Sequence, residues 1–519
     1  MFPDWMNNAP QPFDSVLVAN RGEIAVRILR AAKESGLRGI AVYSDPDKGS
    51  LHVETSDDAI HLPGDNLSET YLNMDAIISA AKQSGAQAIH PGYGFLSERA
   101  DFAKAVQSAD LVWIGPSPEA IETMGDKISA RRRMIESEVP IIPGEELAIE
   151  SDSNPLGVLA SSAARVGYPL LVKASAGGGG KGMRAVYEPK MLRTEYEAAA
   201  REASAAFGDG TVYVERLLTG SRHVEIQVLC DKYGNSIHLN ERDCSLQRRH
   251  QKVIEEAPSP AVTSEIRNAM GIAAIRAAKA VNYEGAGTVE FLLTSKGEFF
   301  FLEMNTRLQV EHPVTELITG VDLVQKQFEV AAGLPLGLSQ ADIGITGHSI
   351  EARIYAEDVS KGFLPAIGKL AMWRPPSTPG VRMDSGFREG DEVTVDFDPM
   401  LAKLIVHAPD RPAALRRLDS ALSEFIVLGV TTNVGFLRQI ARSNTFSEGM
   451  VTTDFLDNVS LDEFSQPQIE DSILVSISAA SNRLGIDRYS RNTNPESSLI
   501  DEYSGHSDDP FRTLTRSFP

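Results

Sequence analysis

Residues 173–184 read KASAGGGGKGMR, with four consecutive glycines between Lys173 and Lys181. Residues 169–175 and 183–187 on either side read as two short strands, so the glycine run forms the tip of a hairpin. Glycine N–H groups can approach phosphate oxygens closely because no Cβ stands between them. Either lysine could neutralise phosphate charge. The stretch therefore indicates a phosphate-binding loop.

Two common phosphate-binding loops do not fit this pattern. A P-loop requires Gly-Lys followed by Ser or Thr and then a helix. Here Gly182 follows Lys181, and the next segment reads as a strand. A dinucleotide-binding loop must open a helix within a βαβ unit. Taken alone, the glycine run also fits a flexible hairpin tip, and the lysine on the entering strand argues against that alternative.

The part of the chain before the hairpin alternates strands with helices. This alternation predicts an open, parallel-sheet α/β unit over roughly the first 120 residues. Apolar runs and helical spacing predict strands at 13–20, 39–44 and 86–90, and helices at 22–35 and 71–84.

The pattern changes after Pro140. We expect a small separate domain over residues 140–215, built around the hairpin. Strands at 222–230 and 287–304 then predict a larger α+β domain that reaches to about residue 455. Residues 460–519 are rich in Ser, Asp, Glu and Asn. One helix is expected there at 470–484, and the last ~30 residues are expected to be disordered.

The bulk composition limits the partners. The chain has 519 residues and a net charge of −21, which argues against nucleic acid as a partner. No apolar run reaches the ~20 residues that cross a bilayer, so no membrane partner is expected. Only Cys230 and Cys244 occur, and residues 1–12 lack the pattern of a signal peptide. We therefore expect a cytoplasmic protein.

Two glutamates lie in apolar strands joined by the turn TSKGE. Glu290 is in GTVEFLL, and Glu303 follows thirteen residues later in FFFLEMN. Antiparallel pairing would place the two acids side by side, and hard carboxylate oxygens suit Mg²⁺ shared with nucleotide phosphates. The alternative is that each glutamate pairs with a lysine or arginine at a strand end.

The polar run EMNTRLQVEHP, residues 303–313, follows directly. At strand spacing, its odd-numbered residues from Glu303 to Glu311 would share one face. An arginine beside a carboxylate suits binding of a small oxyanion and removal of its proton. A solvated outer face is the alternative, and the apolar strand before the run argues against it.

A basic cluster stands out in this acidic chain. Arg248, Arg249, His250 and Lys252 lie within five residues. They could bind nucleotide phosphate or bicarbonate, or pair with the nearby acids. We expect both uses. The nearby acids are Glu241, Asp243, Glu255 and Glu256.

These features together resemble the biotin carboxylase component of acyl-CoA carboxylases, in the ATP-grasp superfamily. Nine matching stretches occur in family order between about residues 13 and 457. They are VANRGEIAVRI (18–28), HPGYGFLSE (90–98), GDK (125–127), KASAGGGGKGMR (173–184), RHVEIQV (222–228), ERDCSLQRRHQKVIEEAP (241–258), EMNTRLQVEHPVTE (303–316), EARIYAED (351–358) and FDPMLAKLIV (397–406).

The resemblance implies four parts of the chain. They are an N-terminal α/β domain (13–125), an ATP-grasp domain (126–345) with a lid at about 140–215, a C-terminal biotin carboxylase domain (346–457) and a polar extension (458–519). It also implies ATP, Mg²⁺ or Mn²⁺, bicarbonate and biotin as ligands, with the biotin presented by a carrier protein.

The resemblance assigns site residues position by position. The ATP site would comprise Lys127, Lys173, Gly178, Gly179, Gly180, Lys181, Gly182, Met183, Glu215, Leu217, Leu218, His223, Gln247 and His250. The metal ligands would be Glu290, Glu303 and Asn305. Bicarbonate and biotin would meet Tyr93, Lys252, Arg307, Gln309, the Val310 backbone and Arg353. Glu311 would be the base, and Arg353 would stabilise the enolate form of biotin.

A carrier domain presents biotin on a lysine flanked by methionines, and no Ala-Met-Lys-Met run occurs here. Only ~60 residues follow residue 457, so no carboxyltransferase domain is expected within the chain. We therefore expect a catalytic subunit that meets a separate carrier and carboxyltransferase, and a homodimer is expected from the family. Two alternatives remain: another ATP-grasp carboxylate ligase, and a non-catalytic homologous subunit.

Overall fold

The computed structural model describes residues 13–146, 155–174, 183–207, 210–249 and 251–459, all within one compact unit. The predicted helix at 470–484 and the predicted disorder after it lie outside these residues. Within the described part of the chain, no helix is long and apolar enough to cross a membrane.

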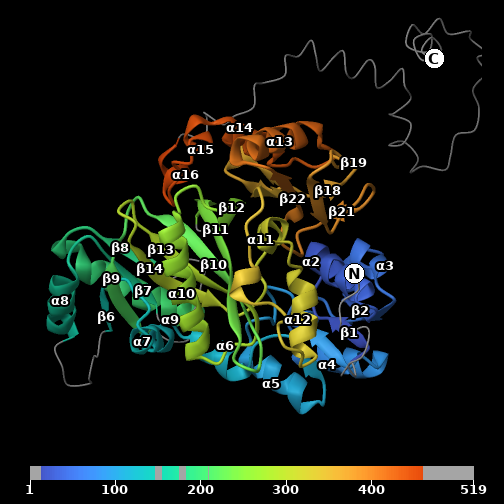
Figure 1. Cartoon of the computed structure of the whole chain (residues 1–519), viewed down its shortest axis with the longest axis horizontal. Coiled ribbons are helices and arrows are strands. Elements are labelled where there is room, and N and C mark those ends of the chain that lie inside the picture. Colours follow the sequence, from blue (N-terminus) through green and yellow to red (C-terminus); the bar gives the residue numbers. More distant parts are fainter. Residues whose placement is uncertain (1–12, 147–154, 175–182, 208–209, 250, 460–519) are drawn as a thin grey trace, which may run out of the picture. The chain divides into compact units, whose positions relative to one another are not determined.

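The N-terminal part is an open five-stranded sheet in the order β3-β2-β1-β4-β5 (Figure 1). All its pairings are parallel, which confirms the predicted fold class for this part. Its strands are β1 (Ser15–Val18), β2 (Arg38–Tyr43), β3 (Asp58–His61), β4 (Ala88–His90) and β5 (Val112–Trp113). Its helices are α2 (Gly22–Glu34), α3 (Leu51–Thr55), α4 (Met74–Ser84), α5 (Ala100–Ser108) and α6 (Pro118–Gly125).

The central strand β1 is buried on both faces, as parallel strands usually are. Val16 and Val18 join the core beside α2, whereas Leu17 joins the core on the other side. The predicted helix at 71–84 begins three residues late, because the Asn73 side chain caps it by accepting a hydrogen bond from the Ala76 N–H.

The predicted hairpin is present as part of a four-stranded antiparallel sheet in the order β6-β9-β7-β8. Lys173 on β7 is the direct partner of Met183 on β8, so the two strands approach on either side of the glycine run. The strands are β6 (Gly144–Glu146), β7 (Leu170–Ala174), β8 (Met183–Val186) and β9 (Val212–Arg216), and the nearby helices are α7 (Lys127–Glu136), α8 (Pro155–Val166) and α9 (Leu192–Phe207).

An eight-stranded antiparallel sheet in the order β14-β13-β10-β11-β12-β15-β22-β20 forms the centre of the unit. It continues across residues 345 and 346, because β15 pairs with β12. Its strands are β10 (Arg222–Cys230), β11 (Ser236–Arg248), β12 (Gln251–Ala257), β13 (Gly285–Leu293), β14 (Phe299–Asn305), β15 (His348–Tyr355), β20 (Val381–Ser385) and β22 (Met400–Ala408).

Helices pack against this sheet along its length (Figure 1). Helix α10 contacts β10 and β11, whereas α11 contacts β11, β12, β15 and β22. The helices are α10 (Ser264–Ala280), α11 (His312–Thr319), α12 (Leu323–Ala331), α13 (Arg411–Glu424), α14 (Val434–Arg442), α15 (Asn444–Ser447) and α16 (Phe455–Asn458). The short strands β16 (Glu357–Asp358), β17 (Leu364–Pro365), β18 (Gly368–Lys369), β19 (Met372–Arg374), β21 (Glu392–Val393) and β23 (Ile426–Leu428) form three two-stranded ribbons.

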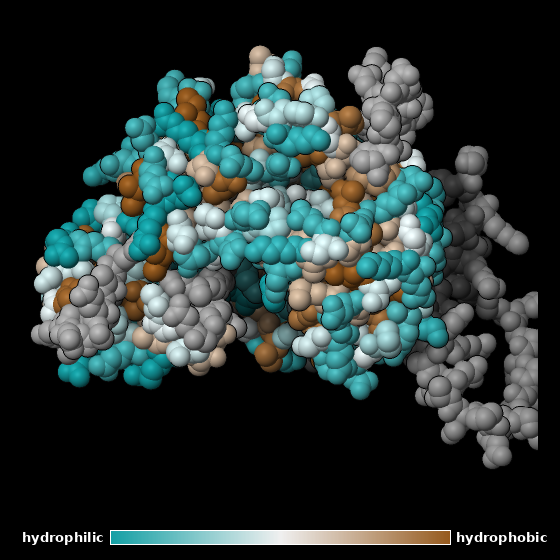
Figure 2. Space-filling view, turned by 90° about the horizontal axis from the view of Figure 1, so that it is seen from below, coloured by the Kyte–Doolittle hydropathy of each residue, from teal (hydrophilic) through white to brown (hydrophobic). Residues whose placement is uncertain are grey.

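The surface facing the viewer in Figure 2 is mostly hydrophilic, with hydrophobic residues scattered over it, and it is hollowed near its middle.

Candidate active site

Two glutamates from the edge of the large sheet stand side by side. Glu290 on β13 and Glu303 on β14 are direct partners in the antiparallel ladder, which confirms the predicted pairing. Such partners share one face, with Cβ atoms about 5 Å apart. Burial and the Glu290 carboxylate raise the pKa of Glu303, whereas Lys127 and Lys173 oppose the rise. A further cation between the two acids would relieve this repulsion.

Lys252 joins this pair to the predicted base. Its ammonium lies 2.7 Å from a carboxylate oxygen of Glu225, 2.9 Å from Glu290 and 2.6 Å from Glu311. Burial alone would lower the pKa of Lys252, but the three carboxylates raise it well above its usual value. The charged ammonium therefore holds acids from three segments around one point.

Glu311 is fully buried and has a second cationic partner. The Arg353 guanidinium lies 3.0 Å from its other oxygen and also donates to Glu255 at 2.6 Å. Burial alone would raise the pKa of Glu311, but Lys252 and Arg353 hold it well below its usual value. Glu311 is therefore ionised at neutral pH, which is the form that can accept a proton.

The chain leaves the sheet after Asn305, and residues 306–311 are irregular. The prediction that the odd-numbered residues up to Glu311 share one strand face is therefore wrong beyond Asn305. Pro313 lies in the first turn of α11, where its fixed φ favours a helix start. Proline also lacks the N–H that a continuing strand would need.

The side chains of this irregular segment still converge, through hydrogen bonds rather than strand spacing. The Arg307 guanidinium donates to Asn305 Oδ1 at 3.1 Å and to Gln309 Oε1 at 3.0 Å, and it pairs with Glu98 at 3.0 Å. Gln309 in turn donates to Glu290 Oε1 at 3.2 Å. The segment thus links a guanidinium and two amides to the acidic pair.

Two lysines lie on the opposite side of the acidic pair. The buried Lys173 ammonium is 2.8 Å from Glu215, and Lys127 is the first residue of α7. Burial alone would lower the pKa of Lys173, but Glu215 raises it. Burial and then Lys173 lower the pKa of Lys127, so the two ammonium groups feel one another. Such a pair suits binding of an anion with several charged oxygens.

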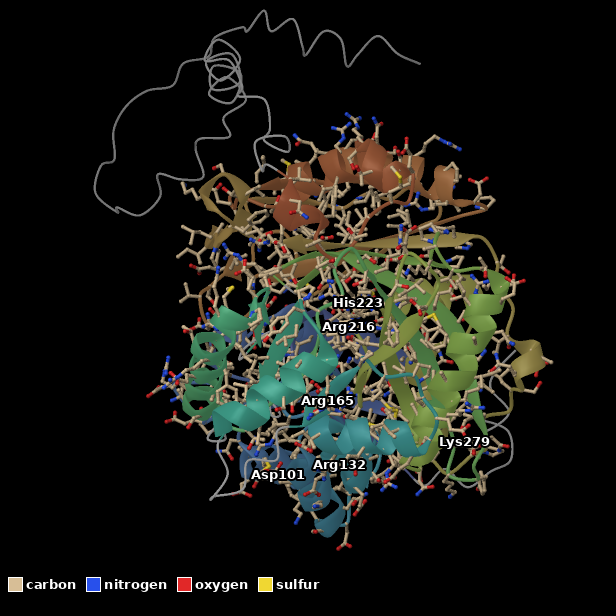
Figure 3. All side chains as sticks on the ribbon, turned by 90° about the vertical axis from the view of Figure 1, so that its left-hand side faces the viewer. Asp101, Arg132, Arg165, Arg216, His223 and Lys279 are labelled. Carbon is tan, nitrogen blue, oxygen red and sulfur yellow. The ribbon has the colours of Figure 1, made fainter. Side chains whose placement is uncertain are left out.

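These groups line one cavity of about 430 Å³. The predicted site residues on its wall are Tyr93, Lys127, Lys173, Met183, His223, Gln247, Lys252, Glu290, Glu303, Asn305, Arg307, Gln309, Val310 and Arg353. His223, on β10, is labelled in Figure 3, and its Nε2 lies 3.0 Å from Glu290. Glu311 and Glu215 contact lining residues from behind, whereas Leu217 and Leu218 do not line the cavity. Gly178, Gly179, Gly180, Lys181, Gly182 and His250 lie outside the described residues.

A second, mostly apolar cavity of about 290 Å³ shares wall residues with the first. Tyr93, Val310, Arg353 and Tyr355 border both cavities. The second cavity is therefore a mostly apolar pocket that reaches Val310 and Arg353, the neighbours of the predicted base, from the N-terminal part of the chain.

Two members of the basic cluster, Arg248 and Lys252, pair with acids other than the four nearby ones, and Lys252 lies on the cavity wall. Arg248 lies 3.4 Å from Glu357 and stacks 3.5 Å from the centre of the Phe363 ring. The hairpin of β11 and β12 turns Lys252 inward opposite Gln247, toward the three site carboxylates. The four nearby acids have other partners: Arg267 for Glu241, Arg222 for Asp243, Arg353 for Glu255, and Arg411 for Glu256, which also lies 2.7 Å from His348 Nε2.

Sequence reasoning missed the residues that hold the site from behind. Arg242 is fully buried and donates at 2.5 Å to Glu225, the first carboxylate partner of Lys252. Its other acceptors are Gln227 at 2.7 Å, and Thr288 and Thr315 at 3.0 Å. A charged residue inside a buried strand was the available signal. Tyr355, Asp398 and Gln251 on the cavity wall were also missed.

The donor set fits a hard divalent cation. Glu290, Glu303 and Asn305 offer carboxylate and amide oxygens on one side of the cavity, the ligand type that Mg²⁺ prefers. His223, Glu225 and Glu290 also bring possible ligand atoms within 4.8 Å of one another. Both carboxylate oxygens of Glu225 already accept hydrogen bonds, one from Arg242 and one from Lys252, so we favour the Glu290 and Glu303 pair.

The fold and site define an ATP-grasp protein. Three family models match it in order: "Biotin carboxylase, N-terminal domain" over residues 12–121, "Carbamoyl-phosphate synthase L chain, ATP binding domain" over 126–339 and "Biotin carboxylase C-terminal domain" over 351–458. The chain belongs to the biotin carboxylase family.

Solved structures and curated relatives agree with this assignment. The biotin carboxylase domain of Hydrogenobacter thermophilus 2-oxoglutarate carboxylase, in complex with MgADP and bicarbonate, is 44% identical with a TM-score of 0.84, covering 88% of this chain and all of that one. Campylobacter jejuni biotin carboxylase is also 44% identical, with a TM-score of 0.83, covering 86% of this chain and 99% of that one.

Two of the curated relatives are longer proteins. The alpha subunit of rice mitochondrial methylcrotonoyl-CoA carboxylase is 52% identical over 87% of this chain. The human mitochondrial propionyl-CoA carboxylase alpha chain is 48% identical over 87%. The chain spans 61% and 62% of the length of these two relatives.

Proposed function

We propose that this chain uses ATP and bicarbonate to carboxylate biotin carried on a separate carrier protein, as the first half-reaction of an acyl-CoA carboxylase. One observation carries the proposal beyond family membership. An ionised, buried Glu311 lies between Lys252 and Arg353, behind a cavity that also holds the Glu290 and Glu303 pair.

The nucleotide would bind at the lysine side of this cavity. Lys127 and Lys173 would neutralise phosphate charge together with Gly178, Gly179, Gly180, Lys181 and Gly182. Met183, Glu215, Leu217, Leu218, His223, Gln247 and His250 would complete the ATP site. The lysines would stabilise the charge that develops on the transferring phosphoryl group.

Glu290, Glu303 and Asn305 would hold Mg²⁺, or Mn²⁺, beside the phosphates. A divalent ion held there would supply positive charge that offsets the negative charge of the phosphates during transfer. The raised pKa of Glu303, caused by burial and by Glu290, supports a cation at this position.

Arg307, Gln309, the Val310 backbone and Lys252 would bind bicarbonate. Glu311 would take the bicarbonate proton while a bicarbonate oxygen attacks the γ-phosphorus and ADP leaves. Because the pKa of Glu311 is low, its proton affinity is modest. Proton transfer would therefore accompany the attack rather than precede it.

The product of this step would be carboxyphosphate, a mixed anhydride that water destroys. It would decompose to CO2 and phosphate, the phosphate would take the proton from biotin N1, and that nitrogen would attack CO2. Arg353 would stabilise the negative charge on the biotin carbonyl oxygen, beside Tyr93 in the cavity wall. Exclusion of water by the closing hairpin domain would protect the anhydride.

Several wider assignments belong to the same proposal. The partners would be a biotin carboxyl carrier protein and a carboxyltransferase, with an acyl-CoA as the final acceptor. An acetyl-CoA acceptor would connect the reaction to fatty acid biosynthesis. We also propose a homodimer, a cytoplasmic location and functional divisions at 13–125, 126–345 and 346–457. The homodimer is supported by the Hydrogenobacter domain, which is described as a dimer.

The test is ATP hydrolysis by the purified chain with and without bicarbonate, and with free biotin added. We expect hydrolysis that requires bicarbonate and rises with biotin, together with label transfer from radioactive bicarbonate to a biotinylated carrier. Hydrolysis indifferent to bicarbonate would favour another ATP-grasp ligase. Nucleotide binding without any hydrolysis would favour a non-catalytic subunit.

A further inference from the structure

A row of ionisable side chains crosses four strands of the large sheet beneath the base. The register pairs Glu255 with Glu351, Arg353 with Lys403, and Lys403 with Asp384. Direct partners and residues two apart on one strand share a face, so all five side chains lie on the same side of the sheet. Glu311 contacts this row through Arg353.

Lys403 is fully buried. Its side chain reaches the main chain of the base segment, which is the irregular stretch of residues 306–311 that ends at Glu311. Its ammonium donates to the Val310 carbonyl at 2.8 Å. The same ammonium lies 3.2 Å from Glu23 and 3.9 Å from Asp384. A buried ammonium is costly unless it is paired and hydrogen-bonded, so these contacts explain how Lys403 is tolerated. They also fix the residue immediately before Glu311.

Glu23 carries the connection to the apolar cavity. It lies in the first turn of α2 and lines that cavity. One of its oxygens accepts a hydrogen bond from the Tyr93 hydroxyl, and the other faces Lys403. A continuous path therefore runs from Tyr93 through Glu23 and Lys403 to the Val310 carbonyl.

We propose that Lys403 and Glu23 are positioning residues. Together they hold the base segment in a fixed position relative to Tyr93 on the wall of the apolar cavity. Lys403 sets the Val310 carbonyl and hence Glu311, while Glu23 ties the same ammonium to Tyr93. The inference deepens the proposed function and rests on it, because the base and the biotin pocket are both part of that proposal.

The surroundings explain why these two residues depend on one another. Burial raises the pKa of Glu23 to about 7, and Lys403 opposes that rise. The carboxylate form of Glu23 is therefore favoured by this ammonium. Asp384 raises the Glu23 pKa further, and Arg382 lowers it. The other charged groups near Lys403 are Glu351 and Arg382.

The test compares Lys403→Met and Lys403→Arg with wild type, using the full chain. We expect Lys403→Met to raise the bicarbonate KM about tenfold and to reduce the stimulation by free biotin about tenfold, since misplaced groups bind bicarbonate less well and react with biotin more slowly. The dissociation constant for ATP should change less than about twofold, because Lys403 does not line the nucleotide side of the cavity. Lys403→Arg should recover part of the loss.

Glu23 supplies a second, independent pair of variants. Glu23→Ala removes both acceptors and should reduce biotin stimulation about tenfold, while the bicarbonate KM measured without biotin rises less than about threefold. Glu23→Gln keeps an acceptor for Tyr93 and should recover most of the stimulation. Lys361→Met is the matched control, since Lys361 is exposed and pairs only with Asp358 among the described contacts.

The outcomes separate this inference from the proposed function. A wild-type chain without bicarbonate-dependent hydrolysis would overturn the proposed function and the inference together. The inference alone would be overturned by a different result. Wild type would be active, Lys403→Met and Glu23→Ala would fold, and the bicarbonate KM and biotin stimulation of both variants would stay within about twofold of wild type. If Lys403→Met fails to fold, the Glu23 pair decides by the same criterion.

Discussion

Glu311 is the residue on which the proposed chemistry turns, and its two cations set its protonation state. Replacing it as Glu311→Gln removes the proton acceptor but keeps the size of the side chain and one acceptor oxygen. We expect kcat for bicarbonate-dependent hydrolysis to fall about 10²- to 10⁴-fold, the usual contribution of a positioned general base. Nucleotide binding, measured by calorimetry, should remain.

The control for this substitution is Glu298→Gln, which changes an exposed glutamate in the turn between β13 and β14. It should leave kcat at the wild-type value. Turnover of Glu311→Gln close to wild type would mean that another group takes the proton.

Arg242 lies outside the walls of the two cavities described above, but its contacts stabilise the site from behind. Its guanidinium has four side-chain acceptors, including the buried carboxylate of Glu225. Arg242→Met should lower the free energy of unfolding by about 3–5 kcal/mol, because it leaves a buried charge with one partner fewer. Urea unfolding measures this.

Arg276→Met is the matched control for Arg242→Met, because half of the Arg276 side chain is exposed. We expect less than about 0.5 kcal/mol of change there. Equal losses in the two variants would contradict the claim that the Arg242 network stabilises the fold.

At this scale the sequence was informative where a pattern was local. The pairing of Glu290 with Glu303 followed from a short turn between two strands. The contacts of Lys252 and Arg242 did not follow, because their partners come from segments up to 73 residues away, and only the tertiary fold brings them together.

Helices and strands position site residues at their ends as well as on their faces. Asp126 caps α7 by accepting a hydrogen bond from the Ser129 N–H at 2.7 Å, and Lys127 is the first residue of that helix. Asp126→Ala should cost about 1 kcal/mol of stability, the usual value of an N-cap. It should also raise the KM for ATP severalfold, because the Lys127 backbone would lose its fixed start.

Asp410→Ala gives the matched comparison, since Asp410 caps α13 in the same way at 2.8 Å and lies outside the cavity wall. Its unfolding cost should be similar, with an unchanged KM for ATP. A similar rise in KM for both variants would show that general destabilisation, rather than the placement of Lys127, affects ATP binding.

The predictions of strands and helices were correct where the spacing of hydrophobic residues agreed with the residues that end or cap each element. The parallel N-terminal sheet and the hairpin around the glycine run were both found. The prediction that one strand continues to Glu311 was wrong, because Pro313 lies in the first turn of a helix. The polar side chains are brought together by the hydrogen bonds of Arg307 rather than by strand spacing. Periodicity alone cannot distinguish these two ways of gathering polar groups on one side.

At the scale of the described unit, one eight-stranded sheet connects the acidic pair at one edge with the Lys403 row at the other end. The sheet crosses residues 345 and 346, where the family resemblance divides the chain. Sequence patterns could place the segments on either side but not their hydrogen bonding, because strand pairing between distant segments leaves no local signal. The continuous sheet gives a physical reason why Lys252 on β12 and Arg353 on β15, the two cations that contact the base, keep a fixed separation.

The stability of the unit should depend on pH through two neutral, buried histidines of the N-terminal part, His52 in α3 and His90 in β4. Burial lowers the pKa of His52 and of His90 to about 4. Between pH 4 and about 6.5 the unfolded chain binds protons that the folded chain does not, so each histidine removes stability as the pH falls through this range. The full effect is about 3 kcal/mol for each histidine.

Carboxyls with raised pKa values act in the opposite direction. Burial raises the pKa of Glu23 and of Glu255 to about 7, so their contribution to stability improves as the pH falls from 7 toward 4.5. The pH dependence of the total stability therefore combines both signs, and the difference between a variant and wild type isolates one group.

The stability of wild type, measured by urea unfolding, should fall relative to that of His52→Gln as the pH falls from 7.5 to 5. A His52→Gln curve parallel to wild type would show that His52 becomes protonated in the folded chain without cost.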